Sequence, residues 1–310
     1  MTKVPPRDKS AESAEAAVQS CYSTWAESYF ADYYENSGAY PPVHRKIVHD
    51  LVAASGARTL LDAGCGPASM LRTLGDLGAA LYGFDLTQEM IVEARKVMAS
   101  HGIPPEHLWQ GSVADPSAFR PPAGSPALFD AAICIGVLPH VPAALDEEVI
   151  ANLRNAVRPG GLVAIEARNQ LFALFTLNRY SYDFFLNDLV GHDVLRQRAG
   201  ADSSALDRVF DELAARFRTD LPPLRKGSAG EPGYDEVLSR THNPLVLKER
   251  FAAAGFSDVR LLFYHYHCLP PMLEAELPRF FRAGSVAMED PSDWRGHFMA
   301  SAFIVTGRRA

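Results

Sequence analysis

The chain has 310 residues, enough for one large domain or for one domain with a sizeable insertion. Its 30 lysines and arginines against 37 aspartates and glutamates give a net charge of −7, and no basic run of the kind that nucleic-acid binders carry is present. The four cysteines lack C-x-x-C spacing, which favours reduced thiols over a disulfide framework or a zinc ribbon. No stretch is apolar enough to span a bilayer, and the N-terminus lacks an apolar signal segment. We therefore expect a cytoplasmic enzyme that binds neither nucleic acid nor membrane.

The first 42 residues are predicted to form a disordered start followed by an N-terminal helical lid. Residues 1–12 are polar and typical of a disordered terminus. The pattern becomes helical and rich in aromatic residues from Ala14 to Tyr34. Pro41 and Pro42 then interrupt the chain before a predicted helix over residues 43–54.

Residues 43–167 are predicted to form the core, centred on the segment 59–67. This segment has an apolar strand end, a glycine turn at Gly64 and Gly66, and Pro67 at a position that a first helical turn tolerates. It predicts a strand that ends in a turn and opens directly into a helix. Ligands of doubly wound sheets bind at such a strand end.

Two acidic residues indicate which ligand this turn binds. Asp62 would repel the pyrophosphate of a dinucleotide but attract the ammonium group of an amino-acid ligand, and Ser69 replaces the third glycine of the dinucleotide pattern. Asp85 follows the next apolar strand, about twenty residues after the glycines, where an acid that accepts hydrogen bonds from a ribose diol is expected. A cationic, nucleoside-bearing ligand such as S-adenosylmethionine fits both carboxylates.

The rest of the core alternates between strand and helix, which predicts a mostly parallel sheet. Strands are predicted over 108–110, 129–135 and 162–167. A helix capped by Thr87 is predicted to reach Ser100, and another is predicted over 143–157.

These residues resemble the class I S-adenosylmethionine-dependent methyltransferases, especially those that act on small molecules. The matching motifs are Leu-Asp-Ala-Gly-Cys-Gly at 61–66, Gly-Phe-Asp-Leu at 83–86, Gly-Ser-Val at 111–113, and Phe-Asp at 129–130 through Arg-Pro-Gly-Gly at 158–161. The resemblance covers residues 45–167. It implies a Rossmann-like, doubly wound, mostly parallel seven-stranded sheet with an antiparallel last strand, and S-adenosylmethionine as cofactor with S-adenosylhomocysteine as product.

The resemblance also assigns cofactor-binding positions. Asp62 and Gly64 hold the methionine portion, Asp85 holds the ribose, and Ser112 with Val113 borders the adenine. An aromatic residue of the lid, Tyr22 or Tyr29, closes over the cofactor. The full predicted set is Tyr22, Tyr29, Asp62, Gly64, Gly66, Asp85, Leu86, Met90, Ser112, Val113 and Ile135.

His140 follows the strand beside the cofactor strand, so its loop is expected to face the transferable methyl group. It is our first candidate for a general base that takes a proton from the nucleophile. The alternative is that His140 caps the following helix or packs against the lid.

Residues 168–240 are predicted to form a helical insertion that acts as a substrate lid. Arg168, Asn169 and Tyr180 are candidate substrate-binding residues, because an arginine fork suits a carboxylate or a phosphate. The alternative is a surface-charged helical cap whose arginines pair internally with acidic residues. His242, just after the insertion, completes the candidate substrate set.

Residues 241–310 are predicted to complete the sheet, with a small helical insertion over 269–296 whose helix is expected near residues 274–281. Asn243 and Pro244 indicate the start of a helix, and the last strand is expected over 300–306. His265 and His267 share one face of the preceding strand and are further base candidates. They are also candidates for a metal site with a third ligand from His242, Glu274 or His297, although no residue is assigned as a metal ligand.

The sequence thus predicts a methyltransferase that acts on a polar, anionic or neutral small molecule of natural-product or sugar type by in-line displacement. Metal-assisted C- or O-methylation through His265 and His267 is the alternative mechanism. A nicotinamide-dependent oxidoreductase and a non-catalytic cofactor-binding regulator are the rival functions. The sequence leaves open which atom is methylated and whether the chain forms a homodimer.

Overall fold

The computed structural model describes residues 11–35, 40–122, 124, 126–200, 203–224 and 233–310. The disordered start expected over 1–12 lies outside these ranges except for its last two residues. The chain divides into two compact units. Unit 1 comprises residues 1–168, 226–262 and 303–310, and unit 2 comprises residues 169–225 and 263–302.

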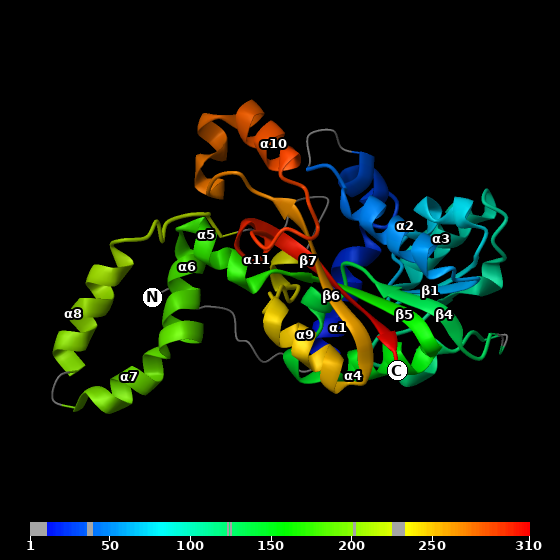
Figure 1. Ribbon diagram of the computed structural model, residues 1–310, viewed down its shortest axis with the longest axis horizontal. Coiled ribbons are helices and arrows are strands. Elements are labelled where there is room, and N and C mark those ends of the chain that lie inside the picture. The colour runs from blue at the N-terminus through cyan, green and yellow to red at the C-terminus, as the bar shows by residue number, and fades with distance from the viewer. Residues whose placement is uncertain (1–10, 36–39, 123, 125, 201–202, 225–232) are drawn as a thin grey trace. The chain divides into compact units, whose positions relative to one another are not determined.

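Seven strands form one sheet in the order β3-β2-β1-β4-β5-β7-β6. The first five strands in this order pair in parallel. Their bounds are Thr59–Ala63 (β1), Ala80–Asp85 (β2), Leu108–Gln110 (β3), Phe129–Cys134 (β4) and Val157–Arg168 (β5). This order and the helices between the strands confirm the predicted Rossmann-like, doubly wound fold (Figure 1).

The last two strands, β6 (Phe256–Tyr266) and β7 (Ala300–Arg309), run antiparallel to each other. The amide of Ala310 donates to the carbonyl of Gly255 over 3.1 Å, and the amide of His267 donates to that of Met299 over 2.8 Å. Rising residue numbers on β6 therefore pair with falling numbers on β7, which is the antiparallel relation. The predicted antiparallel last strand is confirmed, with β7 between β5 and β6.

The central strands are buried on both faces, as expected for parallel strands between two helix layers. Leu60 and Leu61 of β1 are fully buried, and so are all residues of β4 from Ala131 to Cys134. Figure 1 shows α2 (His44–Ser55) and α3 (Gln88–Ala99) on one side of these strands, and α4 (Asp146–Ala156) and α9 (Pro244–Ala253) on the other. As predicted, the Asn243 side chain caps α9 by accepting from the amide of Leu245 over 3.0 Å.

The glycine turn after β1 does not open into an α-helix, so that prediction is wrong. Ala68 has a left-handed φ of 61°, which breaks a helical run just after Pro67. Only two single 3₁₀ turns follow, Leu71–Thr73 and Gly75–Leu77. The ligand-binding turn is therefore built from loop backbone and side chains rather than from a helix N-terminus.

The N-terminal segment contains one helix, α1 (Ala11–Ser23), and a short π-helical turn, Ala31–Glu35. The helical pattern predicted from Ala14 to Tyr34 is thus interrupted by turns after Ser23. Cys21 and Trp25 pack against Tyr234 and Val237, with Val18, Tyr22 and Tyr29 around them. This apolar cluster joins the N-terminal segment to the segment 233–240, which the sequence assigned to the insertion but which packs within unit 1.

Unit 2 contains short helices and a buried asparagine, Asn169, near its start. The helices are α5 (Ala173–Thr176), α6 (Arg179–Phe184), α7 (His192–Ala199), α8 (Ser203–Ala214), α10 (Pro278–Ala287) and α11 (Gly296–Met299). The Asn169 amide nitrogen donates to the carbonyls of Gly296, His297 and Ala300, and its oxygen accepts from the amide of Leu171. Asn169 is buried with every polar atom engaged, so we remove it from the candidate substrate-binding residues.

The helix expected near residues 274–281 is displaced along the chain. The structure has a 3₁₀ run over Pro271–Glu276, and α10 begins only at Pro278. A proline fits the first turn of a helix but clashes with the preceding turn inside one, which explains the shift. The roles of this segment and of residues 168–240 as lids stay predictions.

A buried carboxylate holds the segment 240–250 against α4. Asp146, the first residue of α4, accepts from Arg240 at 2.5 Å and from Arg250 at 3.2 Å. The Nε2 atom of His242 lies 3.6 Å from the same carboxylate, and the His242 side chain is buried. The Nε2 atom of His242 also lies 2.8 Å from the Arg240 guanidinium, and its Nδ1 atom has no partner among the described residues, so its role in substrate binding stays a prediction.

Replacing Asp146 with asparagine is expected to lower the free energy of unfolding by about 3 kcal/mol, because two arginines then lose their buried counter-charge. Urea unfolding of the purified variant measures this loss. Glu147→Gln is the matched control, since Glu147 occupies the same helical turn but is exposed. Equal stability of the two variants would contradict the structural role of Asp146.

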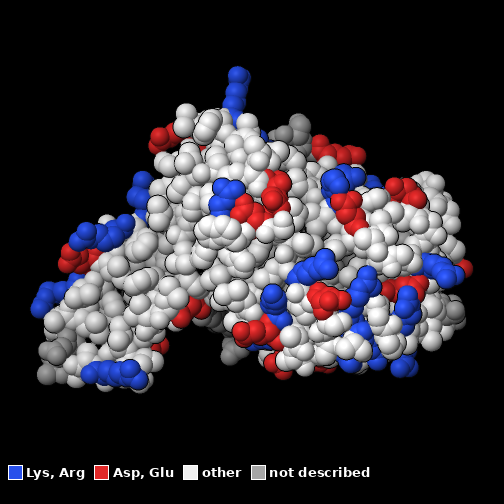
Figure 2. All heavy atoms as spheres, viewed as in Figure 1, with Lys and Arg blue, Asp and Glu red and all other residues white. Residues whose placement is uncertain are grey.

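Charges of both signs are mixed on the face that Figure 2 shows, and the coloured side chains there form no basic stripe that could follow a phosphate backbone. Among the described residues, no helix combines the length and the apolar character needed to cross a membrane.

Candidate active site

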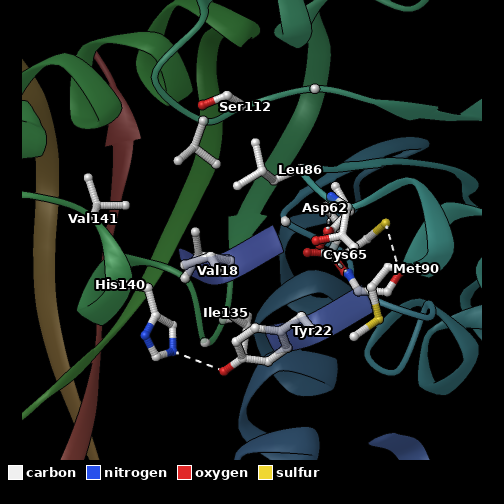
Figure 3. Close-up of a pocket in the computed structure, with 18 of the residues that line it drawn as sticks. Val18, Tyr22, Asp62, Cys65, Leu86, Met90, Ser112, Ile135, His140 and Val141 are labelled. Carbon is white, nitrogen blue, oxygen red and sulfur yellow. Dashed lines mark hydrogen bonds between the residues drawn. The ribbon is translucent and has the colours of Figure 1, made fainter. Parts of the chain in front are cut away.

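A cavity of roughly 1010 Å³, including the open space at its mouth, lies in unit 1 at the carboxyl ends of β1, β2 and β4. This is the edge where ligands of doubly wound sheets bind. All eleven predicted cofactor-binding residues line it, and so does His140. Figure 3 shows α1 crossing the cavity with Val18 and Tyr22 turned into it.

The glycine turn forms one wall through backbone that needs glycine. Gly64 has a φ of 84°, and a Cβ there would overlap the side chain of Val137. The amides of Gly64 and Cys65 both donate to the carbonyl of Phe84, over 2.8 and 2.9 Å, which ties the turn to the end of β2. The wall is thereby fixed before any ligand binds.

Asp85 is held in place by backbone donors on both of its oxygens. Oδ2 accepts from the amide of Gly66 over 2.9 Å, and Oδ1 accepts from the amide of Thr87 over 2.8 Å. Burial raises the pKa of Asp85, and these hydrogen bonds partly oppose the shift. Each carboxylate oxygen keeps a further lone pair, so Asp85 still offers two acceptors to a ligand that enters the cavity.

Asp62 is the most unusual group in the cavity. Its side chain is only 1% exposed, and its Oδ1 atom has no hydrogen-bond partner among the described residues. Burial, together with the nearby charge of Asp85, raises the pKa of Asp62 to about 8. A buried acceptor without a donor carries a large energetic cost, which indicates a ligand that supplies the donor.

Two hydroxyl groups near this carboxylate are also unsatisfied. The Oγ atom of Ser69 and the Oγ1 atom of Thr87 are buried without partners in the described part of the chain, and both residues line the cavity. Thr87 precedes α3 as predicted, but its side chain makes no capping hydrogen bond. The end of the cavity between Asp62 and Thr87 is therefore built for a polar ligand.

The loops that follow β2 and β3 line a further part of the cavity. Gln19 and Gln110 both donate to the carbonyl of Leu86, over 3.2 and 3.0 Å. Asn152 donates to the carbonyl of Val113 over 3.1 Å, and Ser112 donates to the Glu15 carboxylate. These bonds fix the loop residues whose side chains and backbone line this part.

His140 and Tyr22 meet at the cavity wall. The Nδ1 atom of His140 lies 2.7 Å from the carbonyl oxygen of Leu238, so Nδ1 carries the proton. Its Nε2 atom is therefore an acceptor, and the Tyr22 hydroxyl lies 3.3 Å away (Figure 3). Burial first, and the charge of Arg168 second, lower the pKa of His140 to about 4. His140 is thus a neutral base with a fixed tautomer.

Arg168 lies at the end of β5 and donates to the Ser239 hydroxyl. Burial acts to lower its pKa, but Tyr234 and Glu166 outweigh this effect and raise it. The Arg168 side chain also forms a hydrogen bond with the Tyr234 side chain, so its positive charge is partly engaged within the chain. Its electrostatic interaction with His140 and Tyr22 places that charge near the cavity.

The remaining predicted site residues lie in unit 2. The rings of His265 and His267 stack with centroids 5.2 Å apart, as expected from their shared face. The His267 ring also packs 4.7 Å from that of Phe172, and burial lowers its pKa to about 4. Tyr180 is 52% exposed on α6. The roles of these three residues in catalysis or substrate binding stay predictions.

No group of three or more His, Cys, Asp or Glu side chains among the described residues is arranged to hold a metal ion. The metal-assisted alternative therefore lacks a third ligand within this part of the chain.

The sequence analysis did not predict several of the residues that line the cavity. Glu15, Val18 and Tyr34 come from the N-terminal segment, whose spacing shows a helix but not which face meets the core. Val137 and Val141 flank His140 and carry no polar signal. The spacing of Glu15, Val18 and Tyr22 shows that they share one helical face, and this was the signal that could have identified them. Ser69 was considered only as the residue that replaces a glycine of the dinucleotide pattern.

Comparisons with known proteins agree with this site. Residues 61–163 match the sequence model of a family described as a methyltransferase domain. The matched segment runs from β1 to β5, the part of the sheet that carries the glycine turn and both carboxylates.

Two curated relatives are ubiquinone biosynthesis O-methyltransferases. The one from Xanthomonas campestris pv. campestris (strain B100) is 34% identical over 136 residues, which are 44% of this chain and 53% of the relative. The one from Xylella fastidiosa (strain M23) is 33% identical over 137 residues, which are 44% of this chain and 52% of the relative. The chain thus spans about half the length of these relatives.

The solved structure of a DhpI–SAH complex aligns with a TM-score of 0.51 at 15% identity, and covers 97% of this chain and 99% of that chain. At this identity the likeness shows the fold alone.

Proposed function

We propose that this protein transfers the methyl group of S-adenosylmethionine to a polar small molecule. The observation that carries the proposal is the buried Asp62 carboxylate, which has an oxygen without a donor beside a glycine turn. An α-ammonium group supplies the missing donor and the opposite charge. Asp85, Ser69 and Thr87 supply the neighbouring polar positions for the ribose and the methionine portion.

The proposed cofactor fits the order of groups along the cavity. Asp62 binds the ammonium group at one end, and Asp85 accepts hydrogen bonds from the ribose diol next to it. Leu86, Ser112 and Val113 border the base at the other end. Among the residues that the structure describes, three carboxylates (Glu15, Asp62 and Asp85) line the cavity and no lysine or arginine does, which suits a ligand that carries a positive sulfonium.

The sulfonium activates the methyl group, so the protein must chiefly position and desolvate the acceptor. Tyr22 and His140 place a hydrogen-bonding pair at the cavity wall. An acceptor hydroxyl that replaces the Tyr22 hydroxyl on Nε2 gives its proton to His140 as its oxygen attacks the methyl carbon. The carbon–oxygen bond forms as the carbon–sulfur bond breaks, and the sulfur keeps that electron pair.

An oxygen acceptor is favoured over nitrogen or carbon. A hydroxyl must lose a proton when it is methylated, and the neutral Nε2 of His140 is oriented to take it. The relatives named as O-methyltransferases match the core of this chain, which supports the same choice. Arg168, with its charge near His140, suits an acceptor that carries a carboxylate, phosphate or phenolate.

Transfer from S-adenosylmethionine with a carbon-13 methyl group tests the proposal. The protein is incubated with phenolic and carboxylated hydroxy compounds, and the chemical shift of any new methyl signal reports the acceptor atom. A methoxy signal that requires the protein supports the proposal. Confirmed cofactor binding without a transfer signal from any small molecule would overturn it in favour of a macromolecular acceptor or a regulator.

Replacing His140 with glutamine is expected to lower kcat by about 10²- to 10⁴-fold, because an amide cannot accept the proton. Cofactor affinity is expected to change little. In the wild type, the contribution of His140 falls as pH drops through about 4, where Nε2 becomes protonated, and stays constant above about pH 6. The kcat profile between pH 4 and 9 measures this dependence, with Tyr22→Phe as a control that keeps the base. A wild-type rate for His140→Gln would rule out the base role.

A further inference from the structure

Helix α1 presents one continuous face to the cavity. Glu15, Val18 and Tyr22 line the cavity, and Gln19 on the same face bonds to the Leu86 carbonyl. Their spacing of three, four and seven residues places them on a single side of a helix. This face runs from Ser112, which Glu15 contacts, to His140, which Tyr22 contacts.

The Ser112 hydroxyl and two nearby carbonyl groups form hydrogen bonds within the chain. The Ser112 hydroxyl donates to Oε1 of Glu15 and accepts from the amide of Ala114 over 3.0 Å. The carbonyls of Leu86 and Val113 already accept from glutamine and asparagine side chains. The Oε2 atom of Glu15 has no hydrogen bond with a described residue, although Glu15 lines the cavity.

We propose that Glu15 is a cofactor-binding residue that accepts a hydrogen bond from the exocyclic amine of the cofactor's base. This inference rests on the proposed function, because it takes S-adenosylmethionine as the ligand. A carboxylate is an acceptor only, so it favours an amine at this position and opposes a carbonyl. The helix that covers the cavity thereby distinguishes adenine from a base with oxygen in place of the amine.

This assignment places a residue of the predicted N-terminal lid in contact with the cofactor. The loop at Ser112 positions Glu15, and α1 carries Glu15 only when the helix lies over the cavity. Tyr22, two turns further along the same face, then lies against His140, so recognition of the base and enclosure of the acceptor occur on one element.

The test compares the affinities of S-adenosylhomocysteine and S-inosylhomocysteine, which differ by the amine and the carbonyl, in calorimetric titrations. The wild type is expected to bind the adenosyl compound about 30-fold or more tightly than the inosyl compound. The inosyl compound has no amine to donate to the Glu15 carboxylate, so it loses a hydrogen bond to a charged group. Glu15→Gln is expected to reduce that preference by about tenfold, because an amide can donate to the carbonyl. Glu15→Ala is expected to weaken adenosyl binding by about tenfold.

Glu12→Gln is the matched control, since Glu12 lies on the same helix with the same charge but is exposed and does not line the cavity. It is expected to leave both affinities within twofold of the wild type. A Glu15→Gln variant with the wild-type preference would overturn the inference and leave the proposed function standing. A wild type that binds neither compound would overturn the proposed function and the inference together.

Discussion

Replacing Asp62 with asparagine is expected to weaken the binding of S-adenosylmethionine by at least about 100-fold. The carboxylate is buried beside the glycine turn, and asparagine removes the only charge that pairs with the ammonium group in the proposed complex. Calorimetric titration measures the change. Asp193→Asn serves as the control, because the Asp193 side chain is 92% exposed in unit 2. Equal affinities in the wild type and Asp62→Asn would contradict the assignment.

The same substitution is expected to stabilise the protein without ligand at alkaline pH. Asp62 has a pKa of about 8 when folded against 3.8 in its unperturbed state, so the folded chain binds the extra proton between these values. The stability from this proton is fully present below pH 3.8 and is lost as pH rises through about 8. At pH 9, the free energy of unfolding of Asp62→Asn is expected to exceed that of the wild type by several kcal/mol, because each of the roughly four pKa units is worth about 1.4 kcal/mol, and at pH 4 the two are expected to be nearly equal. Urea unfolding at both pH values measures the difference.

Replacing Gly64 with alanine is expected to lower the free energy of unfolding by about 3 kcal/mol and to abolish cofactor binding. The added Cβ would overlap the side chain of Val137, and the φ of 84° is strained for alanine. Gly66→Ala is the matched control, because Gly66 also has a positive φ, of 52°, but has open space where its Cβ would lie. It is expected to lose only about 1 kcal/mol.

A double-mutant cycle separates the overlap from the backbone strain. Adding Val137→Ala to Gly64→Ala removes the side chain that the new methyl group meets, so the double variant is expected to recover about half of the lost stability. Urea unfolding of the four proteins gives the coupling energy. If the changes in the free energy of unfolding were strictly additive, the loss of stability in Gly64→Ala would not arise from overlap with the Val137 side chain.

The core of the fold could be predicted because its signals are local. Apolar runs such as Leu60 and Leu61 can be buried on both faces only between helix layers, and Asp62 and Asp85 follow directly from the ends of two such strands. Once the strands are parallel, both carboxylates must lie at the same edge of the sheet. The sequence therefore located the cavity and the eleven residues predicted to bind cofactor, all of which line it.

The sequence could not show which polar residues serve structure instead. Asn169 has the chemistry of a substrate-binding residue, but the three carbonyls that its amide nitrogen binds lie more than ninety positions away in the sequence. The prediction of a helix after the glycine turn was wrong for another reason. Ala68 has a left-handed backbone conformation, and alanine as a residue type does not indicate such a conformation. Glu15 was missed because periodicity defines a helix face without showing what that face meets.

Calorimetric titration of the wild-type protein with S-adenosylmethionine and with NAD⁺ tests the central claim most directly. The arrangement of Asp62, Asp85 and the glycine turn predicts saturable one-to-one binding of S-adenosylmethionine in the micromolar range, and no heat of binding for NAD⁺. Among its described lining residues, the cavity offers the pyrophosphate of NAD⁺ no lysine or arginine. Binding of NAD⁺ without binding of S-adenosylmethionine would contradict the account and would indicate a dinucleotide-binding enzyme.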